Sequence, residues 1–219
     1  MMSSDAREMM LRRAALELND GDTVNLGIGL PTKVLAHVAP SITVCIHSEN
    51  GVAGIGPLAE YTAGDRNLID AGGNYITTLA GASYFDSAVS FAIIRGGNLD
   101  LTMLGAFEVA SNGDLANWMV PGKYTPGTGG AMELAQKTRR VIVLTTHLDK
   151  AGNPKLVEQC TLPLTAQRCV HRIITDLAVV DVSSGGFELV ELFAGVSVEE
   201  VKAKTGAPLV IIHPLAIFN

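Results

Sequence analysis

The sequence predicts an α/β fold in which helices cover both faces of a mainly parallel sheet that also contains some antiparallel strands. Short β-branched apolar runs alternate with helical segments along the chain, an alternation typical of parallel sheets. Several of these runs end abruptly in polar, glycine-containing loops, and ligands of such folds bind beyond the carboxyl ends of the strands. Two late runs instead flank a Ser-Ser-Gly-Gly turn, which predicts an antiparallel pair.

The N-terminal half begins with a helix and continues with two units of strand and loop. Asp5 is predicted to cap the helix, and Gly21 is predicted to end it. The strand at residues 23–26 runs through a Gly-Ile-Gly turn into Pro31, which suits the first turn of another helix. A second β-branched strand is expected at residues 42–46, directly before a polar loop.

The C-terminal half continues the same alternation. Apolar residues at helical spacing predict helices at residues 87–94 and 131–137. Ser197, with Glu200 three residues later, forms a capping box that begins the last helix. The strands predicted in this half are residues 100–104, 141–145, 177–182, 187–192 and 209–212.

The composition favours one domain, residues 1–219, with part of its surface buried against a partner. Charged residues make up 17% of the chain, against about 25% in a typical domain. The net charge of −6 argues against nucleic-acid binding, which requires a basic stripe to neutralise phosphates. The chain has neither an apolar signal core nor a run near the ~20 apolar residues of a membrane span. We therefore expect a soluble cytoplasmic protein.

The cysteines and histidines are not spaced as metal ligands. No CxxC pair is present, so neither a disulfide framework nor a zinc site is expected, and no HExxH pair occurs. Cys169 and His171 are two residues apart, but a packed thiol is the better interpretation. The remaining residues of these two types are Cys45, Cys160, His37, His47, His147 and His213. We expect no metal site.

Glu49 is the candidate for a reactive carboxylate. It directly follows a predicted core strand and is flanked by Ser48, Asn50 and Gly51, which supply hydrogen-bonding side chains and a flexible backbone. From spacing alone, a solvated loop acid is the ordinary interpretation, because polar loops are common.

Two glycine-containing segments and one asparagine are expected near this carboxylate. Gly27 and Gly29 follow the first predicted strand, and Asn25 either reaches the same crevice or caps the strand end. Gly129 and Gly130 precede a predicted helix, so their amides either face an oxygen that gains charge or form a structural turn. Neither segment matches a dinucleotide fingerprint or a P-loop.

Taken together, ordered motifs along nearly the whole chain resemble the beta subunit of class I 3-oxoacid CoA-transferases. The motifs are VNLGIGLPT at 24–32, SENG at 48–51, GASYFDSA at 81–88, IRGG at 94–97, GDLANW at 113–118, GGAM at 129–132 and ITDLAV at 174–179. The resemblance implies that Glu49 is the nucleophile and that Gly129 and Gly130 lie at the oxyanion site. The residues expected to contact substrate or CoA are Asn25, Gly27, Gly29, Asn50 and Gly51.

The resemblance also implies a reaction and a partner. Coenzyme A would move between acetyl- or succinyl-CoA and a 3-oxoacid such as acetoacetate, through a glutamyl-CoA thioester on Glu49. A separate alpha subunit would complete the site in an α2β2 assembly, with CoA as a substrate and no permanently bound cofactor. Two departures bear on substrate choice: Gly73 stands where many relatives have lysine, and Glu108 where many have glutamine.

Three other functions remain open at this point. Within the same fold, the chain could belong to a 3-oxoadipate CoA-transferase or to an acyl-CoA hydrolase, in which water takes the acyl group. Outside enzymes, it could be a sensor protein that binds a phosphorylated ligand without turnover. A site for an anion gains nothing from an added carboxylate such as Glu49, which argues against the sensor.

Overall fold

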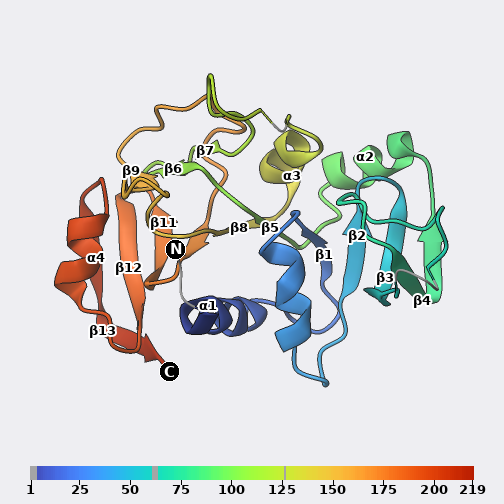
Figure 1. Cartoon of the computed structure of the whole chain (residues 1–219), viewed down its shortest axis with the longest axis horizontal. Coiled ribbons are helices and arrows are strands. Elements are labelled where there is room, and N and C mark those ends of the chain that lie inside the picture. The colour runs from blue at the N-terminus through green and yellow to red at the C-terminus, as the bar shows by residue number, and fades with distance from the viewer. Residues whose placement is uncertain (1–3, 61–63, 126) are drawn as a thin grey trace.

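The computed structural model describes residues 4–60, 64–125 and 127–219, and its main feature is a ten-stranded sheet (Figure 1). The strand order is β13-β12-β11-β10-β8-β5-β1-β2-β3-β4. These strands are β1 (Thr23–Leu26), β2 (Cys45–Ser48), β3 (Val52–Leu58), β4 (Ile76–Tyr84), β5 (Leu101–Leu104), β8 (Arg140–Leu144), β10 (Arg172–Ile174), β11 (Ala178–Ser183), β12 (Gly186–Phe193) and β13 (Leu209–Phe218). A smaller sheet has the order β7-β6-β9, from β6 (Glu108–Ala110), β7 (Leu115–Ala116) and β9 (Leu156–Val157).

The centre of the large sheet is parallel and its two flanks contain antiparallel pairs. Neighbouring strands run parallel from β2 through β1, β5 and β8 to β10. The pairs β2–β3, β3–β4, β10–β11 and β11–β12 are antiparallel, and the edge strand β13 is parallel to β12. The predicted mainly parallel sheet is confirmed, and so is the antiparallel pair around the Ser-Ser-Gly-Gly turn.

Helices pack on both faces of this sheet, as predicted. Alternate residues of β8 belong to different cores, because successive side chains of a strand point to opposite faces. Helix α1 (Ser4–Ala15) and the 3₁₀ helix η1 (Pro31–His37) contribute to one core. Helices α3 (Ala131–Lys137) and α4 (Val198–Lys204) contribute to the other. Helix α2 (Ser87–Arg95) packs beside α3.

Several predicted boundaries near the N-terminus are wrong. Asp5 lies inside the first turn of α1 rather than at its cap. The helix ends at Ala15 instead of Gly21, because the next turns tighten into i→i−3 bonds such as Leu16 N to Arg13 O. The segment that Pro31 begins is a 3₁₀ helix rather than an α-helix.

Strand β2 lies a few residues later than predicted, and six strands were not predicted at all. Because β2 ends at Ser48, the residue before Glu49 is itself part of the strand. Strand β3 contains two glycines and a proline, and these residue types favour a loop when the sequence is considered alone. Strands β6, β7, β9 and β10 have only two or three residues each, too few to show a period. The sixth missed strand is β4.

Candidate active site

Two neighbouring parallel strands bring the candidate residues to one edge of the sheet. Strands β1 and β2 pair in parallel, with Asn25 directly opposite His47. Strand β2 then ends at Ser48, and Glu49 follows at once. Because parallel strands end at the same edge, the segments after β1 and β2 lie side by side there.

The side chain of Glu49 is half-buried, and among the residues that the structure describes one neighbour donates a hydrogen bond to it. Asn25 Nδ2 lies 3.4 Å from Glu49 Oε2, a long contact, and 3.1 Å from the carbonyl oxygen of His47. Asn25 is itself only 2% exposed. Its amide therefore points into the crevice and fixes the Glu49 side chain relative to β2, so it is more than a cap at a strand end.

The glycine-rich segment before α3 packs directly against Glu49. Gly130 is buried, and a Cβ atom added to it would lie 3.1 Å from Glu49 Cγ, so only glycine fits without displacement. Gly129 has φ +49, a conformation that other residues rarely adopt. The structure thus brings Asn25, Glu49 and Gly130 together from three separate parts of the sequence.

The other glycines and Asn50 shape the surrounding backbone. Gly51 has φ +119, and an added Cβ would lie 2.0 Å from the carbonyl oxygen of Phe85, so no other residue can occupy this turn. Gly27 N donates to Met103 O at 2.8 Å, whereas Gly29 is exposed with open space around it. Asn50 Nδ2 donates to the carbonyl oxygen of Ile69 at 2.7 Å. The substrate contacts expected of these residues stay predictions.

The loop that contains Gly73 is held beside Glu49 by two hydrogen bonds. The backbone N–H of Ala71 donates to Ser48 Oγ at 3.0 Å, and Asn50 holds the same loop at Ile69. Gly73 has φ +80, so a lysine here would be strained in the backbone seen in this chain. A lysine at this position therefore favours a different turn, and the bearing of Gly73 on substrate choice stays a prediction.

His47, two residues before Glu49 in β2, is buried against Ser90 and Phe85. His47 is 2% exposed, its Nε2 lies 3.1 Å from Ser90 Oγ, and its ring stacks on Phe85 at 5.8 Å. Burial lowers the pKa of His47, which keeps the ring neutral near pH 7. Its Nδ1 is buried without a hydrogen-bond partner among the described residues. Residues 47 and 49 are two apart at the end of a strand, which is the signal that could have identified His47.

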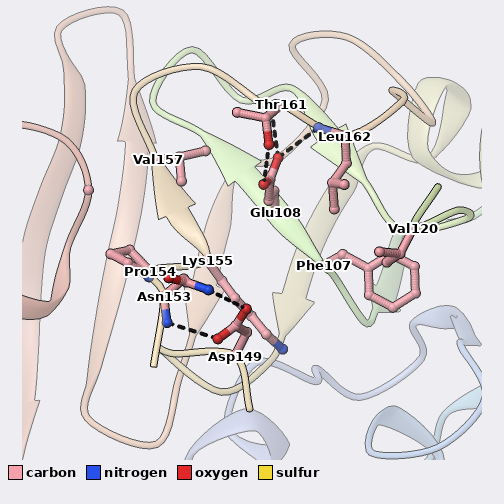
Figure 2. A pocket seen from close by; sticks show the side chains of 11 residues that line it. Phe107, Glu108, Val120, Asp149, Asn153, Pro154, Lys155, Val157, Thr161 and Leu162 are labelled. Atoms are coloured by element: carbon pink, nitrogen blue, oxygen red, sulfur yellow. Dashed lines mark hydrogen bonds between the residues drawn. The ribbon is translucent and has the colours of Figure 1, made fainter. Parts of the chain in front are cut away.

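A separate pocket of about 510 Å³ lies between the small sheet and the loops around it (Figure 2). Glu108, in its wall, accepts hydrogen bonds from Thr161 N, Thr161 Oγ1 and Leu162 N. Lys155 Nζ donates to Thr145 Oγ1 at 2.8 Å, and burial lowers the pKa of Lys155. The carboxylate of Glu108 is thus occupied by donors of the segment at residues 161–162, and its bearing on substrate choice stays a prediction.

The cysteines are not positioned for catalysis. All three are free, and burial raises the pKa of Cys160 and of Cys169 to about 12, so both remain protonated thiols. The interpretation of Cys169 as a packed thiol is confirmed by its 5% exposure. Within the described ranges, no group of three or more potential ligands could hold a metal ion. Of the helices in the described part of the chain, none has the length and apolarity needed to cross a bilayer.

Comparisons with known proteins give consistent matches. The family model described as coenzyme A transferase matches residues 7–204. A Bacillus subtilis protein, described as the B subunit of a probable succinyl-CoA:3-ketoacid coenzyme A transferase, is 50% identical and covers 94% of this chain and 96% of its own length. Human mitochondrial succinyl-CoA:3-ketoacid coenzyme A transferase 2 is 50% identical over 94% of this chain, which spans only 40% of that protein.

A solved structure has the same fold. The apoenzyme of an acyl-CoA transferase from Escherichia coli O157:H7 superimposes with a TM-score of 0.78 over 97% of this chain, at 21% sequence identity. This chain corresponds to 43% of that longer one.

Proposed function

The chain belongs to the coenzyme A transferase family, and from this premise we propose that it is the subunit that carries the nucleophile of a 3-oxoacid CoA-transferase. The reaction moves CoA from a donor such as succinyl- or acetyl-CoA to an acceptor such as acetoacetate. The observation that carries the proposal is the position of Glu49, which lies against Gly130 and within reach of Asn25 at the carboxyl edge of the sheet.

A carboxylate is a weak nucleophile in water, so its reaction with a thioester requires positioning and exclusion of solvent. Glu49 attacks the acyl carbonyl of the donor, and the amides of Gly129 and Gly130 stabilise the tetrahedral oxyanion. The CoA thiolate leaves, and an acyl-glutamyl anhydride remains. The close packing of Gly130 against Glu49 supports this assignment because it leaves the reacting carbon beside the glycine backbone.

The next step loads the enzyme with CoA and completes the first half of the reaction. The thiolate attacks the carbonyl carbon of Glu49, which forms the glutamyl-CoA thioester and releases the donor acid as its carboxylate. The acceptor carboxylate then attacks this thioester, and the same steps in reverse order produce the new acyl-CoA and regenerate Glu49. No net proton is consumed. Asn25 donates its amide to the Glu49 carboxylate of the free enzyme, before the attack on the donor.

The proposal includes a partner and a location. The Bacillus subtilis relative is described as one subunit of its enzyme, which supports a separate alpha subunit that completes the site, and we propose an α2β2 assembly. We treat residues 1–219 as one domain of that assembly. The low fraction of charged residues, 17%, supports burial of part of the surface. We also propose that the enzyme is cytoplasmic, with CoA as a substrate and no permanently bound cofactor.

The rival activities differ in their acceptor. An acyl-CoA hydrolase releases free CoA without any acceptor acid, whereas a transferase forms a new acyl-CoA only when an acid is present. A 3-oxoadipate CoA-transferase uses a longer dicarboxylic acceptor in the same reaction.

The test is co-expression with the alpha subunit, followed by initial-rate assays over a panel of donors and acceptors. We expect double-reciprocal plots that are parallel for donor and acceptor, because the donor acid leaves before the acceptor binds. Free CoA that appears at the same rate with and without acceptor would contradict the transferase assignment and favour the hydrolase.

A further inference from the structure

A row of three polar side chains crosses the centre of the large sheet. Thr102 of β5 pairs in register with Asn25 of β1, and Asn25 pairs in register with His47 of β2. Paired positions of neighbouring parallel strands point to the same face of a sheet, so the three side chains lie side by side. All are buried, with exposed fractions of 0% for Thr102 and 2% for each of the other two. The row therefore lies out of solvent, with the donor to Glu49 in its middle.

The opposite face of the same three strands is apolar. The residues that alternate with the row all belong to the core to which α1 and η1 contribute: Val24, Ile46, Leu101 and Met103. The row itself faces the side that α2 covers, where His47 Nε2 lies 3.1 Å from Ser90 Oγ. Polar side chains in this position lose their contacts with water, which is unfavourable unless other hydrogen bonds replace them.

Two atoms of the row lack such a replacement. Among the residues that the structure describes, neither Thr102 Oγ1 nor His47 Nδ1 has a hydrogen-bond partner. The two residues flank Asn25, one on each neighbouring strand. Buried polar atoms nearly always have a partner, and an ordered water commonly supplies it where no protein group is within reach. The two unpartnered atoms therefore indicate bound water in the layer beside Asn25.

The amide of Asn25 offers an acceptor to such a water. Its Nδ2 donates toward β2, to His47 O at 3.1 Å and to Glu49 Oε2 at 3.4 Å. Strand β5, which carries Thr102, lies on the other side of β1. The amide oxygen Oδ1 is the second arm of the same planar group and accepts up to two hydrogen bonds. Neighbouring strands are about 4.8 Å apart, a spacing that one water bridges between two side chains.

We propose that Thr102 is a positioning residue, and that an ordered water between its hydroxyl and Asn25 Oδ1 fixes the orientation of the Asn25 amide. This inference rests on the proposed function, because the amide in question is the donor to Glu49. The reverse orientation of the amide turns Oδ1 toward the carboxylate and sets two acceptors against each other. The water adds to the bond with His47 O in excluding that orientation, so Thr102 acts on Glu49 through Asn25.

The fold alone does not require the hydroxyl of Thr102. Valine has nearly the same shape, is equally suited to a strand and leaves no polar atom to satisfy in a position that is 0% exposed. An unpartnered hydroxyl in such a position is a local departure from the rules of a stable core, and departures of this kind are found at functional sites. The hydroxyl next to Asn25 is therefore the feature to remove.

The experiment removes one buried hydroxyl at a time from the enzyme assembled with its alpha subunit. Thr102→Val deletes the hydroxyl of the row, and Thr102→Ser keeps it. Thr138→Val is the matched control, because Thr138 Oγ1 is also buried without a partner among the described residues, but it lies at the opposite end of α3 from Gly130. Thr102→Val is also combined with Asn25→Ala. Urea unfolding establishes that each variant is folded, and kcat is measured per active site.

We expect Thr102→Val to lower kcat roughly 5- to 10-fold, the effect of one net hydrogen bond. Thr102→Ser should stay within about twofold of the wild type, and so should Thr138→Val. In the Asn25→Ala background, Thr102→Val should cause no further loss, because two residues that act through one amide are not additive. A purely structural effect of Thr102→Val would instead persist in that background and overturn the proposal, as would full activity of Thr102→Val or an equal loss in Thr138→Val.

A crystal structure of the wild-type enzyme tests the proposal without any variant. It should show an ordered water within hydrogen-bond distance of both Thr102 Oγ1 and Asn25 Oδ1, and a structure without that water would overturn the inference. Failure of the proposed function is recognised separately, by an active wild-type enzyme that never carries CoA on Glu49. In that case a loss in Thr102→Val that Asn25→Ala abolishes would still establish the link between Thr102 and Asn25.

Discussion

Two glutamates at opposite edges of the parallel sheet are held in contrasting ways. Glu17, 5% exposed, lies near the amino ends of β8 and β10 and accepts hydrogen bonds from Arg13, Arg140 and Arg172. Glu49, at the carboxyl edge, is half-buried and accepts one long hydrogen bond from Asn25.

The contrast shows how one residue type serves stability in one place and chemistry in another. Burial alone would raise the pKa of Glu17, but hydrogen bonds from Arg172 and Arg13 outweigh it, and the pKa lies below its ordinary value. A carboxylate paired with three guanidinium groups has its oxygens occupied and cannot attack a carbonyl carbon. Glu49 has a neutral amide as its neighbour instead, so its oxygens remain free to react.

The largest expected effect is on activity at Glu49. Glu49→Gln keeps the size of the side chain but removes the attacking anion, so transfer by the assembled enzyme should fall roughly 10⁴-fold or more. Unfolding in urea should stay within about 0.5 kcal/mol of the wild type. Glu158→Gln, at an exposed glutamate, is the control and should keep full activity. Substantial transfer by Glu49→Gln would place the nucleophile elsewhere.

The next largest effect is on stability at Glu17. Glu17→Gln leaves the three arginines without their shared anion, which should cost roughly 3–5 kcal/mol of unfolding free energy. The enzyme that remains folded should keep its kcat. Denaturant titration measures the first quantity and active-site titration the second. A stable variant with lost activity would reverse the roles assigned to the two glutamates.

Glu17 should also determine the response to acid. Its folded-state pKa is lowered, so its stabilisation is present above the ordinary value of 4.5 and is lost as pH falls through the lower folded-state pKa. The wild type should therefore lose stability more steeply than Glu17→Gln below about pH 4.5. Urea midpoints measured between pH 3 and pH 7 test the difference, and parallel curves for the two proteins would contradict it.

A smaller effect is expected at Asn25. Asn25→Ala removes the donor to Glu49 Oε2, and kcat should fall roughly 10²-fold, as when one preorganised donor is lost. Asn67→Ala, at an exposed asparagine, should leave kcat unchanged. Stopped-flow measurement of thioester formation shows whether the loss lies in the chemical step; an unchanged rate would make Asn25 a structural residue.

The smallest effect is expected at His47, which supports Glu49 from beneath. His47→Ala should lower kcat roughly tenfold, by loosening the strand end that carries the nucleophile. His47→Gln should restore most of it, because an amide can also bond to Ser90. Since burial lowers the pKa of His47, the ring is neutral at pH 7, and rate profiles of the wild type and His47→Gln should have the same shape between pH 7 and pH 8. A step found only in the wild type would give His47 a proton-transfer role.

The sequence predicts the grouping of Asn25, Glu49 and Gly130 better than it predicts what surrounds them. Asn25 lies near the end of one apolar run and Glu49 directly follows another. The ends of neighbouring parallel strands meet at one edge of the sheet, so the two residues are expected to lie close together. The His47–Ser90 contact joins residues 43 apart and depends on how α2 packs against β2. The Glu17 cluster draws its arginines from α1, β8 and β10. The i,i+4 spacing indicates the Arg13–Glu17 pair, but no local pattern adds Arg140 and Arg172.

The hairpin of β3 and β4 shows a second limit. Gly54, Gly56 and Pro57 favour a loop by local propensity, yet pairing with β2 and β4 makes residues 52–58 a strand. Tertiary pairing therefore decides the structure of this segment.

The most direct test of the account is to trap the covalent intermediate. The enzyme assembled with its alpha subunit is incubated with acyl-CoA in the absence of acceptor, quenched, digested and examined by mass spectrometry. The account predicts CoA attached as a thioester to the peptide that contains Glu49, and its disappearance when the acceptor acid is added before the quench. An active enzyme whose Glu49 peptide never carries CoA would contradict it.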